Sequence, residues 1–192
     1  MSVCQIDPQN EVTIKNLLTA FESESNAHAK YTAYAAKADS DGLHAVAGLL
    51  RAIARSEQIH GKNFARVIRQ LGGEPEAQIQ AMEVKSTLEN LTTALGDEIY
   101  EIDSMYPRFL AENGSTDNSA ARTYAWALEA EKTHAHLLGE EIKRMEAGKA
   151  HASAGASVDF FVRSVCGFLS KTPEPERCWA CDRFCGAFEI IR

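Results

Sequence analysis

Four long segments of the chain have apolar residues about 3.6 positions apart, which is the spacing of one face of an α-helix. Short, glycine-containing breaks at 40–42 and 113–116 predict antiparallel neighbours, and a longer connection follows Leu71 and extends to about Ala81. The sequence therefore predicts a mainly α protein whose core is an antiparallel four-helix bundle. The predicted helices are approximately residues 11–38, 43–71, 82–113 and 117–147.

Each apolar stripe is interrupted near its middle by acid, or by acid and histidine. The interrupting residues are Glu24 in the first segment, Glu57 and His60 in the second, Glu98 and Glu101 in the third, and Glu131 and His134 in the fourth. Three of them repeat at one offset, since 24 + 74 = 98, 57 + 74 = 131 and 60 + 74 = 134. We therefore expect two copies of one helical hairpin, related by an approximate two-fold axis. Glu101 breaks this symmetry, because the residue 74 positions before it is Ala27.

The repeated Glu-x-x-His motifs predict a dinuclear metal site. Glutamate and histidine three residues apart share one helix face and can reach one metal ion. Several carboxylates converging in an apolar core would be protonated unless cations compensate their charge. Oxygen-rich ligation with one imidazole per metal favours iron or manganese, although zinc can occupy such sites. One Glu from each of two helices, plus Glu-x-x-His from the other two, is the ligand arrangement of ferritin-like di-metal bundles.

The C-terminal part of the chain has a different composition. Residues 148–158 are mostly small, which is typical of a flexible linker. Residues 159–192 are rich in aromatic residues and contain four of the five cysteines. We therefore predict a helical domain over 1–147, a linker over 148–158 and a small separate module over 159–192.

Four stretches of the helical part resemble rubrerythrins, which are peroxide-reducing relatives of ferritin. They are A-F-E-S-E-S-N-A-H-A-K-Y (20–31), S-E-Q-I-H (56–60), E-I-Y-E-I-D-S-M-Y-P (98–107) and A-E-K-T-H (130–134). The resemblance implies a ferritin-like bundle and a non-haem di-iron peroxidase that reduces hydrogen peroxide to water.

The same resemblance implies a role for each residue that matches the family motif. It implies that Glu57 and Glu131 bridge two iron ions, that Glu24 and His60 bind one iron, and that Glu98 and His134 bind the other. Glu101 would bind the first iron in the oxidised state and yield it to His60 in the reduced state. Tyr31 matches a family tyrosine whose hydroxyl lies near the site. Packing in the core is an equally good interpretation of Tyr31.

The cysteine-containing module resembles rubredoxin, in which two Cys-x-x-Cys knuckles hold one iron ion. V-C-G-F (165–168) matches the end of the first knuckle and C-W-A-C (178–181) matches the second. Arg163 takes the place of the first cysteine, and a guanidinium group cannot bind a metal. Three outcomes remain open: Cys185 joins Cys166, Cys178 and Cys181 around iron or zinc; the fourth position is water or empty; or no metal binds and the module is held by packing alone.

The resemblance also implies partners and leaves two other functions open. It implies an external electron donor, rubredoxin or an NADH-dependent reductase, and a homodimer. The first alternative is a ferroxidase or iron-binding protein of the ferritin type, against which Glu101 argues. The second is a redox sensor that uses the altered cysteine cluster.

Composition and charge exclude several other classes of protein. The longest apolar runs fall short of the roughly 18 residues that cross a bilayer. A net charge of −7 without a basic cluster argues against nucleic acids and anionic membranes as partners. The N-terminus lacks the features of a secretory signal, so we expect a cytoplasmic protein. In that reducing compartment the cysteines are expected to be thiols or metal ligands, and Cys4 a simple thiol.

Overall fold

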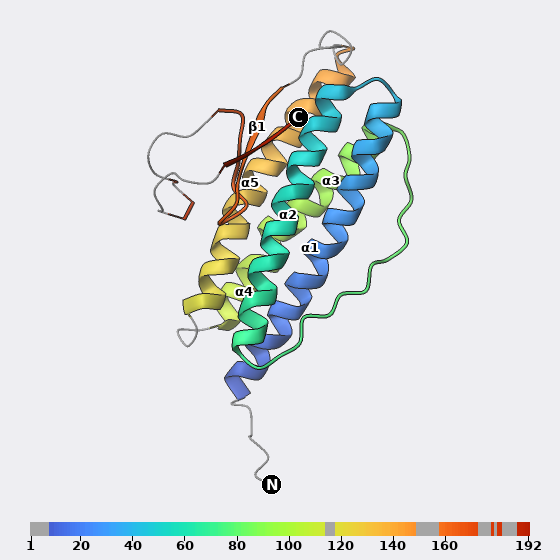
Figure 1. Cartoon of the computed structure of the whole chain (residues 1–192). Coiled ribbons are helices and arrows are strands. Elements are labelled where there is room, and N and C mark those ends of the chain that lie inside the picture. Colours follow the sequence, from blue (N-terminus) through green and yellow to red (C-terminus); the bar gives the residue numbers. More distant parts are fainter. Residues whose placement is uncertain (1–7, 114–117, 149–157, 173–177, 179, 182–187) are drawn as a thin grey trace.

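The computed structural model describes residues 8–113, 118–148, 158–172, 178, 180–181 and 188–192 (Figure 1). Its helices are α1 (Pro8–Ser40), α2 (His44–Gln70), α3 (Thr87–Tyr100), the π-helical turn η1 (Glu101–Met105), α4 (Tyr106–Asn113) and α5 (Asn118–Glu146). Because α3, η1 and α4 follow one another without a break, they form one composite helix. This composite helix, α1, α2 and α5 lie side by side in a bundle, as the sequence predicts.

The third helix begins later than the apolar spacing predicts, at Thr87 and not near residue 82. Ser86 caps it: its hydroxyl accepts from the Glu89 backbone N–H, and the Glu89 carboxylate accepts from the Ser86 backbone N–H. This Ser-x-x-Glu capping box ends the connection and starts the helix. The connection therefore runs to residue 86, alongside α1, where Asn26 donates to the Gln78 carbonyl at 3.1 Å.

The bundle core consists of two apolar clusters separated by a polar layer. One cluster lies near the α1–α2 turn and includes Leu50, Ile53 and Leu138. The other lies toward the opposite end and includes Phe64 and Tyr124. On α1, α2 and α5 the acidic and histidine residues fall between the two clusters along the helix. Apolar packing on both sides therefore isolates the polar layer from water.

A three-stranded antiparallel sheet covers part of α2 and α5. Its strands are β1 (Phe160–Arg163), β2 (Leu169–Ser170) and β3 (Phe188–Ile191), in the order β2-β1-β3. Arg55 on α2 binds Glu189 on β3 with two hydrogen bonds of 2.6 Å. This bidentate ion pair fastens the sheet to the bundle.

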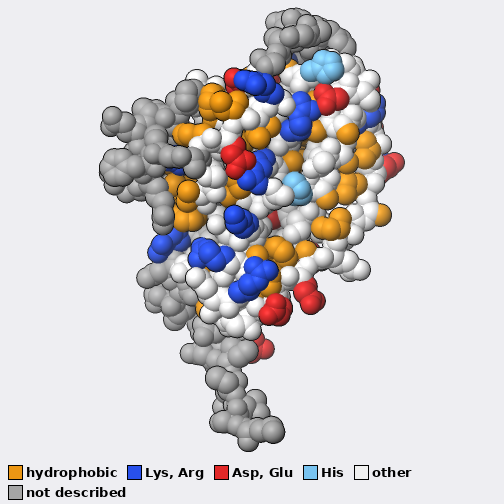
Figure 2. All heavy atoms as spheres, in the orientation of Figure 1, with side chains coloured by type: hydrophobic (Ala, Val, Ile, Leu, Met, Phe, Trp, Pro, Cys, Tyr) orange, Lys and Arg blue, Asp and Glu red, His pale blue; other side chains and the backbone are white. Residues whose placement is uncertain are grey.

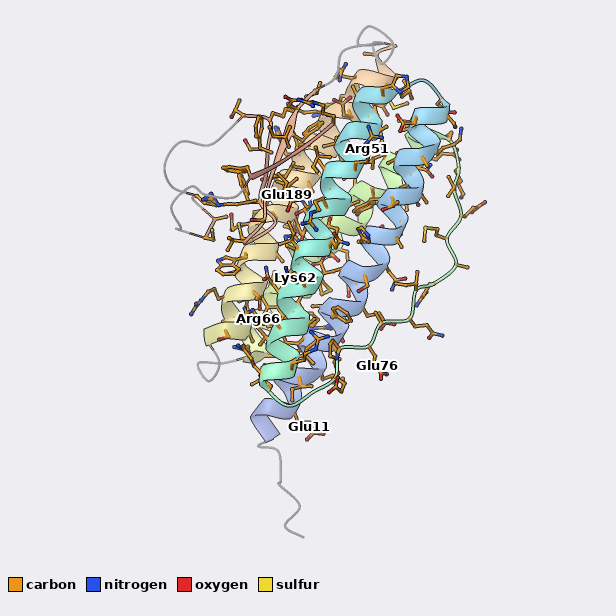
Figure 3. The ribbon with its side chains drawn as sticks, in the orientation of Figure 1. Glu11, Arg51, Lys62, Arg66, Glu76 and Glu189 are labelled. Carbon is orange, nitrogen blue, oxygen red and sulfur yellow. The ribbon has the colours of Figure 1, made fainter. Side chains whose placement is uncertain are left out.

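The outer face of α2 is basic, with Arg51, Lys62 and Arg66 following the helix axis (Figures 2 and 3).

Among the described residues, no helix is both long enough and apolar enough to cross a membrane.

Candidate di-metal site

The polar layer of the bundle brings six of the predicted ligands into two overlapping clusters. Within each cluster the candidate ligand atoms all lie within 4.8 Å of one another. The first cluster is Glu24, Glu57, His60 and Glu131, and the second is Glu57, Glu98, Glu131 and His134. Since Glu57 and Glu131 belong to both clusters, they are the two side chains that can bridge two metal ions.

The orientation of these two carboxylates suits bridging. Glu57 places Oε2 at 3.0 Å from His60 Nδ1 and Oε1 at 3.2 Å from His134 Nδ1. Glu131 places Oε1 at 3.1 Å from His60 Nδ1 and Oε2 at 2.6 Å from His134 Nδ1. Each carboxylate therefore presents one oxygen to each half of the site.

Glu24 and Glu98 occupy equivalent positions at the two ends of the site. Tyr106 Oη donates a hydrogen bond to Glu24 Oε1, and Tyr31 Oη donates one to Glu98 Oε1 at 2.7 Å. The second oxygen of each carboxylate faces a histidine, with Glu24 Oε2 at 3.5 Å from His60 Nδ1. A tyrosine therefore orients each terminal carboxylate and leaves one oxygen for a metal.

The atoms that face the centre are buried and have no hydrogen-bond partner among the described residues. They are Glu24 Oε2, both oxygens of Glu57, His60 Nδ1, Glu98 Oε2, both oxygens of Glu131, and His134 Nδ1. An unsatisfied buried polar group costs about 1–3 kcal/mol, and a charged one costs more. Two cations at the centre would satisfy all of these atoms at once. The donor set therefore fits two metal ions, each with one imidazole nitrogen and several carboxylate oxygens.

The electrostatics of the layer also favour cations. Burial raises the pKa of Glu24 to about 8 and raises the pKa of Glu98 and of Glu101 well above the usual carboxyl range. Burial opposes protonation of both histidines, but the carboxylates around them raise the pKa of His60 and of His134. Bound cations would let Glu24 and Glu98 ionise at neutral pH, so metal binding would release protons.

Glu101, the seventh predicted ligand, lies beside the two clusters and belongs to neither. It is the first residue of η1, its side chain is buried with 6% exposed, and its Oε1 accepts a hydrogen bond from Ser23 Oγ at 2.6 Å. Single π-helical turns often occur at functional sites. The structure therefore places Glu101 next to the candidate metal positions but directs one of its oxygens toward α1.

Sequence reasoning missed Tyr106, the symmetry partner of Tyr31. A π turn contains one residue more than an α turn, so the repeat offset rises from 74 to 75 within α4, directly after η1, and is 74 again at Glu131 and His134 on α5. With that offset, 31 + 75 = 106 and 34 + 75 = 109, which pairs Tyr31 with Tyr106 and Tyr34 with Phe109. The change of offset between two aromatic pairs is the signal that would have identified Tyr106.

The first knuckle of the C-terminal module, residues 163–168, packs against the outer edge of the His60 ring. Ser56 Oγ lies 3.4 Å from His60 Nε2 and donates to the Gly167 carbonyl at 2.5 Å. Asn63 donates to the Val165 carbonyl at 2.8 Å. Gly167 has φ +80°, and a Cβ at this position would lie 2.3 Å from His60 Nε2. Only glycine allows this close approach.

Three cysteine thiols form a second candidate metal site. The sulfur atoms of Cys166, Cys178 and Cys181 lie within 4.8 Å of one another, and the first two are 3.9 Å apart. Burial raises the pKa of the Cys166 and Cys178 thiols. Arg163, at the position of the absent cysteine, is buried with its guanidinium 5.0 Å from the centre of the Phe188 ring. Cys185 and Cys4 lie outside the described residues.

The family model named Rubrerythrin matches residues 15–142. The chain is 33% identical to nigerythrin of Nitratidesulfovibrio vulgaris, a match that covers 89% of this chain and 82% of that protein. It is 31% identical to Rubrerythrin-2 of Clostridium acetobutylicum, a match that covers 90% of this chain and 93% of that protein.

Solved structures agree with these sequence matches. A fully reduced, all-ferrous structure of nigerythrin aligns with a TM-score of 0.80 and 28% identity, over 99% of this chain and 88% of that one. A bacterioferritin of Desulfovibrio desulfuricans aligns with a TM-score of 0.72 and 23% identity, over 80% of this chain and 93% of that one, which confirms the predicted ferritin-like fold. The chain belongs to the rubrerythrin family.

Proposed function

We propose that the protein is a non-haem di-iron peroxidase that reduces hydrogen peroxide to water with electrons from an external, NADH-linked donor. The observation that carries the proposal is the set of buried, unpaired oxygen and nitrogen atoms that converge on two positions shared by Glu57 and Glu131. A ferrous pair held there would supply the two electrons that cleavage of the peroxide O–O bond requires.

Side chains of this chain would position the metals and move protons. Glu57 and Glu131 would hold both metals, while Glu24 with His60 and Glu98 with His134 would complete one position each. Tyr31 Oη and Tyr106 Oη keep the terminal carboxylates oriented. Glu101 lies beside the metal positions with Oε1 held by Ser23, so its other oxygen is placed to relay a proton to a peroxide oxygen.

Electrons would enter beside His60, where the first knuckle is seated. An iron ion bound by Cys166, Cys178 and Cys181, with Cys185 as a candidate fourth ligand, could pass electrons to the bundle, whereas zinc there would be structural only. The proposed donor is rubredoxin or an NADH-dependent reductase. The proposal also keeps the expected homodimer and cytoplasmic location.

A ferroxidase or iron-binding role is the second candidate, and the bacterioferritin-like fold favours it. A ferroxidase would oxidise ferrous iron with oxygen and would not turn over peroxide. A redox sensor is the third candidate, supported by the 3.9 Å separation of the Cys166 and Cys178 sulfur atoms. In a sensor, replacing Cys178 and Cys181 with Ser would abolish an oxidant-dependent structural change. In a peroxidase supplied directly with electrons, the same replacement would leave peroxide turnover intact.

The deciding experiment compares peroxide consumption by the iron-loaded wild type and by Glu101→Gln. We expect the wild type to consume peroxide in the presence of a reduced donor, and Glu101→Gln to lose most turnover while binding iron normally. Rapid iron oxidation by oxygen without peroxide turnover in the wild type would favour the ferroxidase and refute the proposal.

A further inference from the structure

Glu101 is a fifth carboxylate beside a site whose charge two divalent cations already balance. When ionised, the four inner carboxylates, Glu24, Glu57, Glu98 and Glu131, carry four negative charges, and two divalent cations carry four positive charges. Adding ionised Glu101 would leave an excess negative charge in a buried, low-dielectric site, which is costly. Removing one electron from each cation adds two positive charges and reverses this preference. Charge balance alone therefore favours Glu101 outside the reduced site and inside the oxidised one.

Ser23 holds the Glu101 carboxylate in the outer position. Its hydroxyl donates to Glu101 Oε1 at 2.6 Å, a short distance typical of a hydrogen bond to a charged acceptor. Ser23 belongs to α1 and directly precedes Glu24, whereas Glu101 belongs to η1. The hydrogen bond therefore fixes the carboxylate relative to a neighbouring helix and not only to its own.

Glu101 lies on a widened turn of its helix, and its partner Ser23 borders a groove. In η1 the Tyr106 N–H donates to the Glu101 carbonyl, five residues back, which makes this turn wider than an α turn. A groove of about 530 Å³ lies next to it, and its lining includes Ser23, Tyr100 and Met105. Ser23 therefore borders an open groove, whereas the Glu101 carboxylate that it contacts is buried within the wider turn.

We propose that Ser23 is a positioning residue: its hydroxyl is the resting place of the Glu101 carboxylate and sets how readily Glu101 joins the metals when they are oxidised. This inference rests on the proposed di-iron function. It adds a residue that touches neither the metals nor the substrate and acts only through Glu101.

The test is the reduction potential of the iron-loaded full-length chain. Ser23→Ala removes the hydrogen bond that favours the reduced arrangement, so the ratio of inner to outer positions should rise about 10- to 100-fold, as expected for one hydrogen bond to a charged group. For a two-electron couple, this change corresponds to a reduction potential of Ser23→Ala that is about 30–60 mV lower than that of the wild type. A redox titration followed by the absorption of the bundle iron measures the shift.

Two further variants separate positioning from a general effect on the helix. Ser25→Ala is the matched control, because among the described residues the Ser25 hydroxyl donates to the Phe21 carbonyl of its own helix, at 2.6 Å, and to no side chain of another helix. Ser23→Thr restores the hydroxyl. We expect the potentials of Ser25→Ala and Ser23→Thr to match the wild type, and only Ser23→Ala to shift.

The inference is overturned if Ser23→Ala has the same potential as Ser25→Ala and the wild type. Failure of the proposed function gives a different result: the wild type would bind iron but consume no peroxide, and the potentials of all variants could still be compared. Alanine is a strong helix former, so Ser23→Ala is expected to fold.

Discussion

Replacing Gly167 with alanine tests whether the first knuckle is seated on the metal site. The added Cβ would lie 2.3 Å from His60 Nε2, about 1 Å closer than ordinary van der Waals contact. His60 cannot move aside, because it is buried and Glu24, Glu57 and Glu131 surround its Nδ1. The knuckle must therefore move away from the His60 ring and from α2.

The cost of the substitution has two parts. The left-handed backbone at φ +80° costs about 1–2 kcal/mol for a residue with a Cβ. Undocking breaks the hydrogen bonds from Ser56 and Asn63 to the knuckle, worth about 1 kcal/mol each. Together these terms are about 3–4 kcal/mol of lost stabilisation, or roughly a hundredfold or more in the protection of the amides in the knuckle.

Amide hydrogen exchange measures this change directly. In Gly167→Ala we expect protection of β1 and the knuckle to fall by about two orders of magnitude, and that of α2 and α5 to stay unchanged. Gly72→Ala is the matched control, since Gly72 has φ +83° and no atom within 4 Å of an added Cβ. Equal protection of the knuckle in both variants would refute docking onto His60.

Three further predictions concern the bundle. Tyr106→Phe and Tyr31→Phe should each weaken ferrous binding about tenfold, because each leaves one oxygen of a terminal carboxylate without its hydrogen bond. An anaerobic titration with ferrous iron measures the loss, and weaker binding in Tyr31→Phe alone would contradict the symmetry across the π turn. Glu57→Gln should weaken iron binding at both metal positions, whereas Glu24→Gln should weaken it at one. Analysis of the iron content per chain distinguishes the two variants, and an equal loss of iron in both would argue against bridging by Glu57. Without metal, thermal stability should fall as the pH rises from 5 to 8, because the pKa of Glu24 is about 8 in the folded state and near 4.5 in the unfolded state, so unfolding releases a proton in this range. Glu24 alone contributes a slope of about 1.4 kcal/mol per pH unit, and the raised pKa values of Glu98 and Glu101 act in the same direction, so a rise in stability would refute the reasoning.

The ligand set could be predicted from sequence because it depends on local spacing. Glu-x-x-His fixes two side chains on one helix face whatever surrounds the helix, and the offset of 74 shows that the two copies belong together. The start of the third helix was wrong although its signal is present, since Ser86 and Glu89 form a capping box. The prediction used apolar spacing alone and so included residues 82–86 in the helix. These residues belong to the connection, which is held to α1 by contacts such as the one between Asn26 and the Gln78 carbonyl.

Other features depend on tertiary contacts that no local pattern contains. The π turn has no motif of its own and appears in sequence only as a shift of the offset to 75 between Tyr31 and Tyr106. The seating of Gly167 on His60 joins residues 107 positions apart (167 − 60). The contact between Ser23 and Glu101 is equally remote in sequence, and a serine on a helix carries no indication of its acceptor.

The central claim is that the bundle holds two iron ions that turn over peroxide. The most direct measurement is iron content per chain after anaerobic ferrous reconstitution, followed by peroxide consumption by the same sample. We predict about two irons per chain in the bundle, retained when Cys166 and Cys178 are replaced by Ser, and peroxide consumed when a reductant is supplied. Less than one iron per chain in the bundle after reconstitution would contradict the account.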